Sequence, residues 1–190
     1  YFRRRRNLSV LAILALIEPE REDYMERIND LVFSICDEYS WCLAAHTPTQ
    51  GDAAIDPYVV DLFNGETAAM LAALTHVLGE KLHPVVKARA EAEVRRRVIE
   101  PFKAKFQPGE MGGNNWSTVV GGSAAICFYL LDRASFRTVL PRFCDSLNDF
   151  VASYENDGTC TEGFSYWNYG FGFFVAYAQH LYLFTEGKEN

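Results

Sequence analysis

The chain has 190 residues, of which 49% are hydrophobic and 14% aromatic, and its formal net charge is −7. This length and composition predict one domain, or one large piece of a domain, and they exclude a disordered chain. The acidic balance disfavours a nucleic-acid-binding protein. The longest apolar run, residues 8–17, is too short to span a bilayer.

The first residues are Tyr1 and Phe2, followed by four arginines at positions 3–6. We interpret the chain as a segment of a longer protein, in which any signal peptide lies outside the segment. The arginine run is typical of a solvated helix end, with phosphate or a membrane surface as the alternative contact. Five cysteines without a Cys-x-x-Cys pair predict neither a disulfide framework nor a zinc site.

Apolar residues recur at helical spacing along most of the chain, and no segment shows sustained alternation of period two. The sequence therefore predicts an all-α fold without a major β-sheet. Gly65 lies inside one predicted helix, Pro101 is expected to kink or restart another, and Ser135 is a candidate helix cap. About seven helices are expected, at residues 8–17, 19–39, 57–78, 83–106, 116–131, 135–155 and 166–185.

More apolar helices alternate with more charged ones along the chain. The helices at 57–78, 116–131 and 166–185 are the apolar ones, and those at 83–106 and 135–155 carry most of the charge. This alternation predicts concentric layers, in which an inner helix is covered on most sides and an outer helix on one side. Glycine-rich loops precede two of the inner helices, so ligand-facing loops are expected to cluster at one end.

Two polar stretches stand out from the helical pattern. Residues 112–117 read Gly-Gly-Asn-Asn-Trp-Ser, and residues 157–172 contain three aromatics within four positions, between glycines. Aromatic faces and phenol hydroxyls at such density are typical of a ligand-binding surface. A loop followed by a buried aromatic helix is the alternative interpretation of residues 157–172.

The order of four motifs resembles the heparinase II/III family, whose relatives include alginate and oligoalginate lyases. The Asn-Asn-Trp and Glu-Gly-x-x-Tyr-Trp-x-Tyr-Gly elements are the specific parts, and the resemblance covers the chain from about the second helix onward. The motifs are Trp41-x-x-x-x-His46-Thr47-Pro48, Asp61-Leu62-Phe63-x-x-Glu66-Thr67-Ala68, Asn114-Asn115-Trp116, and Asp157-Gly158 followed by Glu162-Gly163-x-x-Tyr166-Trp167-x-Tyr169-Gly170.

This resemblance implies an incomplete α/α toroid, followed in the whole protein by antiparallel β-sheet domains. Residues 1–190 would form the toroid or part of it. The implied activity is cleavage of a uronic-acid-containing acidic polysaccharide by β-elimination, without a metal or organic cofactor. The implied partner is an acidic polysaccharide or oligosaccharide, and the expected location is periplasmic or secreted rather than cytoplasmic.

The resemblance also implies roles for individual residues. Asn115 matches the residue that neutralises the C6 carboxylate of the uronic acid, and Tyr169 matches the catalytic acid and base, with Tyr166 as the second catalytic candidate. Some relatives have a histidine where this chain has Trp116, and another family histidine lies beyond the toroid. The expected substrate-binding residues are His46, Asn114, Trp116, Glu162 and Trp167, although helix capping by Glu162 and core packing by Trp116 are alternatives.

Two other functions stay open at this stage. An α/α-toroid glycoside hydrolase would need paired carboxylates, and Asp61, Glu66, Asp157 and Glu162 are the available acids. A non-catalytic, carbohydrate-binding helical fragment is the third possibility. An isolated toroid fragment of a lyase is itself expected to be inactive.

Overall fold

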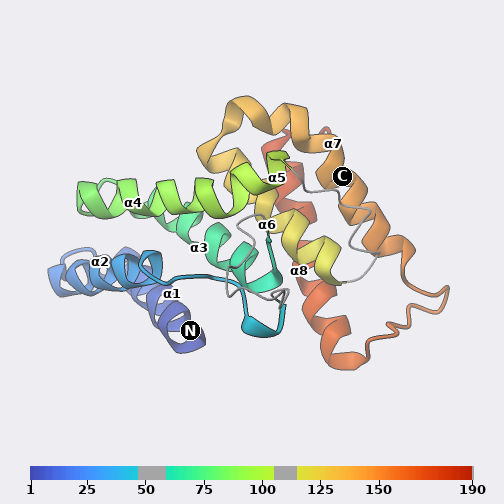
Figure 1. Cartoon of the computed structure of the whole chain (residues 1–190), viewed down its shortest axis with the longest axis horizontal. Coiled ribbons are helices and arrows are strands. Elements are labelled where there is room, and N and C mark those ends of the chain that lie inside the picture. The colour runs from blue at the N-terminus through green and yellow to red at the C-terminus, as the bar shows by residue number, and fades with distance from the viewer. Residues whose placement is uncertain (47–58, 105–114, 190) are drawn as a thin grey trace, which may run out of the picture.

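The computed structural model describes residues 1–46, 59–104 and 115–189, and every regular element within these ranges is a helix (Figure 1). The predicted all-α class is therefore confirmed for the described part of the chain. None of its helices combines the length and the hydropathy that crossing a bilayer requires. The elements are α1 (Phe2–Ile17), α2 (Glu22–Cys36), η1 (Ala44–His46), α3 (Leu62–Leu78), α4 (Pro84–Val94), η2 (Arg95–Ile99), α5 (Glu100–Ala104), α6 (Asn115–Leu131), α7 (Arg133–Ala152) and α8 (Phe164–Phe184).

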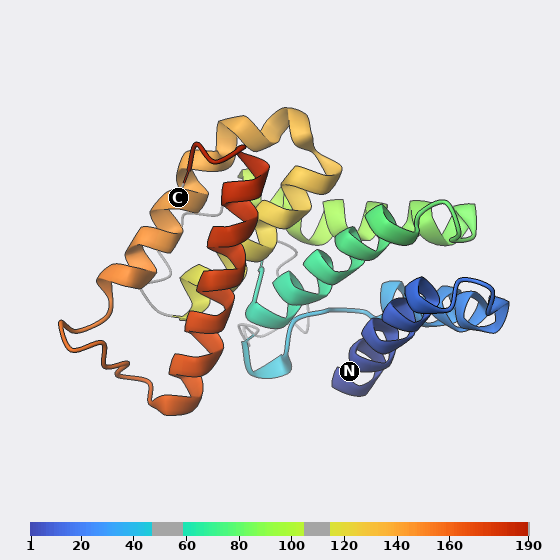
Figure 2. The same ribbon diagram turned by 180° about the vertical axis from the view of Figure 1, so that it is seen from behind.

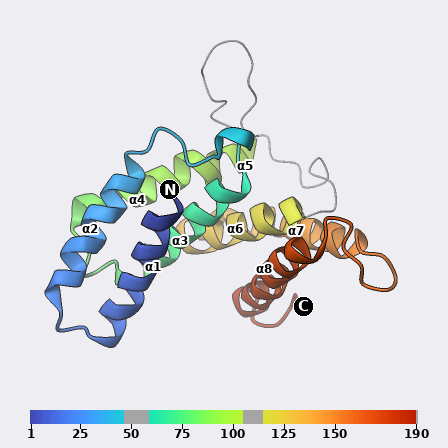
Figure 3. The same ribbon diagram turned by 90° about the horizontal axis from the view of Figure 1, so that it is seen from below.

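Neighbouring helices pack in pairs, α1 on α2, α3 on α4 and α6 on α7. The most extensive contacts between pairs join α3 to α6, and α8 packs on the other side of α6. Seen from below, α1 and α2 lie at one end of the molecule and α8 at the other, with α3 and α6 between them (Figure 3). From behind, α8 runs across α6 (Figure 2). The arrangement of these helices as an incomplete α/α toroid stays a prediction.

Burial distinguishes the central helices from α8. Most residues of α3 and α6 are buried, as expected for inner helices. In α8, by contrast, only Gly170, Tyr177 and Leu181 are buried, and Phe164 is 83% exposed. The expectation that residues 166–185 form a covered inner helix is therefore wrong for the described part of the chain, where α8 packs on α6 and presents a broad apolar face.

Helix ends differ from the predicted positions where a side chain decides the boundary. The second helix ends at Cys36, before the predicted end near residue 39. The N-cap of α7 is Asp132, whose carboxylate accepts a hydrogen bond from the Ser135 backbone N–H at 3.3 Å. The predicted cap, Ser135, thus lies inside the first turn, because a carboxylate three residues earlier already accepts its amide hydrogen.

A π-helical turn, η2, lies just before Pro101 in the fourth predicted helix. Pro101 has no N–H to donate, and its ring would clash with the carbonyl of Arg97 in a regular α-helix. The chain instead widens into η2 and continues as α5, so it is neither restarted nor broken. The Arg97 carbonyl accepts a hydrogen bond from Asn64 Nδ2 at 3.2 Å, which joins this turn to α3.

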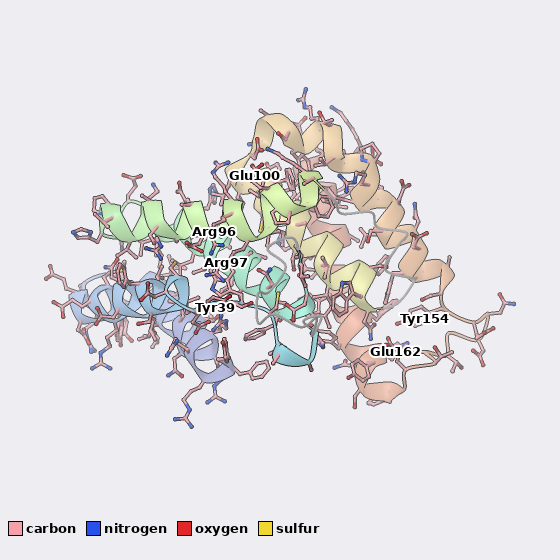
Figure 4. All side chains as sticks on the ribbon, in the orientation of Figure 1. Tyr39, Arg96, Arg97, Glu100, Tyr154 and Glu162 are labelled. Atoms are coloured by element: carbon pink, nitrogen blue, oxygen red, sulfur yellow. The ribbon has the colours of Figure 1, made fainter. Side chains whose placement is uncertain are left out.

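Two buried arginines attach the N-terminal helices to the rest. Arg97 donates to the Glu38 carbonyl at 2.6 Å, and its guanidinium lies 4.5 Å from the ring centroid of Trp41, close to the labelled Tyr39 (Figure 4). Arg5 is only 7% exposed and pairs with the Glu38 carboxylate at 2.6 Å. The arginine run is therefore not simply a solvated helix end, since one of its members is a buried ion-pair partner.

Gly122 of α6 provides a direct test of the packing between α6 and α8. A Cβ atom at this position would overlap the ring of Tyr177. Gly122→Ala should therefore lower the free energy of unfolding by roughly 1–3 kcal/mol, measured by urea denaturation.

Gly172 of α8 is the matched control, since a Cβ there meets no atom within 4 Å. Gly172→Ala should raise stability by roughly 0.5–1 kcal/mol through helix propensity. Equal effects of the two substitutions would contradict the described contact between α6 and α8.

Candidate functional site

Three helices bring the central site residues together. Glu66 lies in the first turns of α3, Asn115 is the first residue of α6, and Tyr169 lies near the start of α8. The start of α3 is fixed by Asp61, whose Oδ1 accepts the Asn64 backbone N–H at 2.7 Å. The start of α8 follows Gly163, whose φ of 94° is readily adopted only by glycine.

A hydrogen bond joins Tyr169 to Glu66 across 103 residues of sequence, with the phenol hydroxyl donating to Oε1. Burial, and next the hydrogen bond to Glu66, raise the pKa of Tyr169 well above its usual value. Burial also raises the pKa of Glu66, aided by the charge of Asp61 and opposed by the hydrogen bond from Tyr169. At neutral pH the phenol is therefore the proton donor of the pair.

The side-chain amide of Asn115 is buried without a hydrogen-bond partner among the described residues. Its residue exposure is 3%, and neither Oδ1 nor Nδ2 has a hydrogen-bond partner among the described residues. The amide packs directly against Gly170, where a Cβ would overlap Oδ1 and lie 2.5 Å from Cγ. Because a buried amide left unsatisfied costs about 1–3 kcal/mol, Asn115 is a candidate ligand-binding group.

His46 of η1 and Trp116 of α6 contact each other next to Asn115. His46 Nδ1 lies 2.8 Å from Asp61 Oδ2, and since a carboxylate only accepts, Nδ1 donates the hydrogen of this bond. The His46 and Trp116 rings meet edge to face at a centroid distance of 5.3 Å. Asp61 also accepts from the Leu43 backbone N–H at 2.8 Å, which fixes the short helix that carries His46.

The remaining predicted residues lie apart from the pair of Tyr169 and Glu66. Trp167 stacks on Phe171 at 5.4 Å along the outer side of α8, and Tyr166 is 52% exposed. Glu162 is exposed on the connection from α7, near Tyr154 in Figure 4, and it does not cap α8, because the N-cap is Gly163 without a side-chain hydrogen bond. Asn114 lies outside the described residues.

An open, mostly apolar groove of about 510 Å³ runs between α3, α6 and α8. Glu66 lies at one end, and His76 and His180 also contribute to its walls. Neither Tyr169 nor Asn115 lines the groove, so the groove and the predicted site share only the carboxylate of Glu66. The other lining residues are Ala69, Met70, Ala73, Val77, Ile126, Tyr129, Leu130, Phe173, Tyr177 and Phe184.

Sequence reasoning did not place Glu66 or Asp61 among the lyase site residues. The available signal was an acid within an otherwise apolar helix, since such a group requires a partner or water. It also missed Tyr177, whose hydroxyl lies 2.8 Å from Ser123 Oγ. These contacts join residues 54 and 103 positions apart, which no local pattern reveals.

The described ranges contain no group of three or more histidine, cysteine, aspartate and glutamate side chains that could hold a metal ion. All five cysteines are free thiols. The site residues, namely amide, phenol, imidazole and carboxylate, can donate and accept hydrogen bonds and transfer protons.

No protein-family model matches the chain. A search of curated proteins likewise finds no match.

The unsatisfied amide of Asn115 predicts an unusual response to substitution. Asn115→Leu, the nearest apolar shape, should raise the free energy of unfolding by about 1–2 kcal/mol in urea denaturation, because it removes a buried polar group without a partner.

Asn64→Leu, at a buried asparagine of α3, is the matched control. Asn64 Nδ2 donates to the carbonyls of Val59 and Arg97, both at 3.2 Å, so its loss should lower stability by about 1–3 kcal/mol. Destabilisation by both substitutions would indicate that Asn115 has a structural partner.

Proposed function

We propose that this chain is the α/α-toroid part of a polysaccharide lyase that cleaves a uronic-acid-containing acidic polysaccharide by β-elimination. The observation that carries the proposal is the buried amide of Asn115, without a partner in the described part of the chain and packed against Gly170, beside Tyr169. The resemblance of the motifs to the heparinase II/III family supports the same assignment. A periplasmic or secreted location and β-sheet domains elsewhere in the protein belong to this proposal.

The first chemical requirement of such an elimination is charge stabilisation. Removal of the C5 proton of a uronic acid places negative charge on the C6 carboxylate. The Asn115 Nδ2 group would donate a hydrogen bond to a carboxylate oxygen and stabilise that charge as it develops. A hydrogen bond to a charged group contributes about 1.5–3 kcal/mol, which would offset the cost of burying the free amide.

The second requirement is proton transfer. Tyr169 would take the C5 proton and return a proton to the departing glycosidic oxygen, so that one residue acts as base and then as acid on the same face of the sugar. Tyr166, one turn earlier on α8 and half exposed, is the second candidate for donation to the leaving group.

Substrate contacts would come from the flanking residues. His46, oriented by Asp61, presents Nε2 as a hydrogen-bonding group, and the Trp116 ring beside it offers a face for a sugar ring. Trp167, Glu162 and Asn114 stay proposed contacts for sugars further along the polymer.

A paired-carboxylate hydrolase has less support. Asp61 is fully buried and accepts hydrogen bonds from two backbone amides and His46, so it is not free to protonate a leaving group. Asp157 and Glu162 lie on the exposed connection between α7 and α8. Glu66 is engaged by Tyr169.

The proposal predicts an increase in ultraviolet absorbance when the full-length protein is incubated with heparan sulfate, alginate or hyaluronan, because β-elimination creates an unsaturated uronic acid. Tyr169→Phe should reduce kcat by roughly 10²- to 10⁴-fold, since the proton-transferring hydroxyl is lost. Tyr182→Phe, a tyrosine of the same helix that is 49% exposed, is the control and should leave the rate unchanged.

Three outcomes would count against the lyase. Absence of new absorbance across a broad panel of acidic glycans would overturn it. New reducing ends without a double bond would favour the hydrolase, and tight glycan binding with unchanged polymer length would favour the non-catalytic binding protein.

A further inference from the structure

We infer that Glu66 is a positioning residue for Tyr169 that accepts the phenol proton during elimination and then returns it; this role rests on the proposed lyase function. The geometry that points to it is the hydrogen bond from the Tyr169 hydroxyl to Glu66 Oε1, made between α8 and α3. Such a bond both fixes the orientation of the phenol and provides a path for its proton.

The surroundings of Glu66 argue against a purely structural carboxylate. Its neighbours Gly65 and Thr67 on α3 are buried, and no salt bridge in the described ranges involves Glu66. A partly buried carboxylate held only by a phenol loses hydration without gaining a cation. A glutamine would accept the same hydrogen bond without the charge, so folding does not require the acid.

The proton relay balances in both directions. As Tyr169 Oη binds the C5 proton, its own proton passes to Glu66 Oε1, so the C5–H and Oη–H bonds break while new Oη–H and Oε1–H bonds form. The C5–H electron pair becomes the C4–C5 double bond, and the glycosidic oxygen departs with the C4–O electron pair. Glu66 then returns its proton to Oη as Tyr169 protonates that oxygen, and the carboxylate ends ionised, as it began.

The relay implies a defined pH dependence. Glu66 must be ionised to accept a proton, so the rate should rise with pH through its pKa, which burial holds above the ordinary value of 4.5. The groups whose charges act on the pair are Asp61, the N-cap of α3 that is itself bonded to His46, and Tyr177 on α8. From α6, Ser123 contacts Tyr177, and the groove beside Glu66 also contains His76 of α3 and His180 of α8.

Glu66→Gln in the full-length protein tests the inference, with alginate, heparan sulfate and hyaluronan as substrates. The substitution should lower kcat by roughly 10²- to 10³-fold with little change in KM, and the acidic limb of the rate profile should disappear. Its stability at pH 7 should not fall, because the raised pKa means that ionised Glu66 opposes folding at this pH. The carboxylate of Glu80, just beyond α3, is fully exposed, and Glu80→Gln is therefore the control for the loss of one charge.

Two further measurements separate this inference from the proposed function. In ¹³C-tyrosine NMR, with the Tyr169 signal assigned by Tyr169→Phe, the Tyr169 Cζ resonance should move with pH as Glu66 ionises above its ordinary pKa of 4.5, and Glu66→Gln should abolish this pH dependence. This readout needs no substrate. In kinetics, the double variant should be no slower than Tyr169→Phe alone, since Glu66 acts only through Tyr169.

Retention of wild-type kcat and of the acidic limb by Glu66→Gln would overturn the inference, and so would a Tyr169 resonance that keeps its pH dependence in this variant. Additive losses in the double variant would also overturn it, because they would give Glu66 a role independent of the phenol. If the wild-type protein is inactive but Glu66→Gln abolishes the pH dependence of the Tyr169 resonance, the lyase proposal is overturned while the pairing of Glu66 with the phenol is confirmed.

Discussion

The close approach of α3, α6 and α8 is the constraint on which the rest of the structure depends. The helices meet where one partner lacks a side chain, so that its backbone can lie against a side chain of the other. The contacts are Gly65 against Ser123, Gly122 against Tyr177, and Gly170 against Asn115. Because these contacts hold α8 against α6 and α6 against α3, a phenol on α8 can reach a carboxylate on α3.

The N-terminal half is joined by different forces. Buried guanidinium groups of Arg5 and Arg97 pair with carboxylates and carbonyls, and they hold the end of α2 against α3 and η2. The same region fixes one edge of the site, because Asp61 begins α3 and also holds His46. Charged contacts thus orient the flank of the site, whereas glycine contacts set its centre.

Local patterns predict much of this fold and little of its long-range pairing. Apolar spacing located the helices because each helix packs one face against its neighbours. It did not predict the exposure of α8, because an apolar sequence does not reveal whether another element packs on it. The glycine-rich motifs drew attention to Asn115 and Tyr169, whose roles stay predictions. Asn115 lies near Tyr169 because its amide packs against Gly170, and the hydrogen-bond partner of Tyr169 lies 103 residues away in sequence. Neither contact follows from local sequence.

Two groups at this three-helix contact oppose folding. Within the described ranges, the Asn115 amide has no hydrogen-bond partner, and the Glu66 carboxylate is paired only with a phenol. Apolar or neutral side chains of similar shape would serve the fold better. Under the proposed function, the carboxylate of a uronic acid would accept a hydrogen bond from the Asn115 amide and so satisfy the first of these groups. Binding such a ligand would return free energy that folding alone leaves unrecovered, so under this proposal substrate affinity and protein stability would be coupled at Asn115.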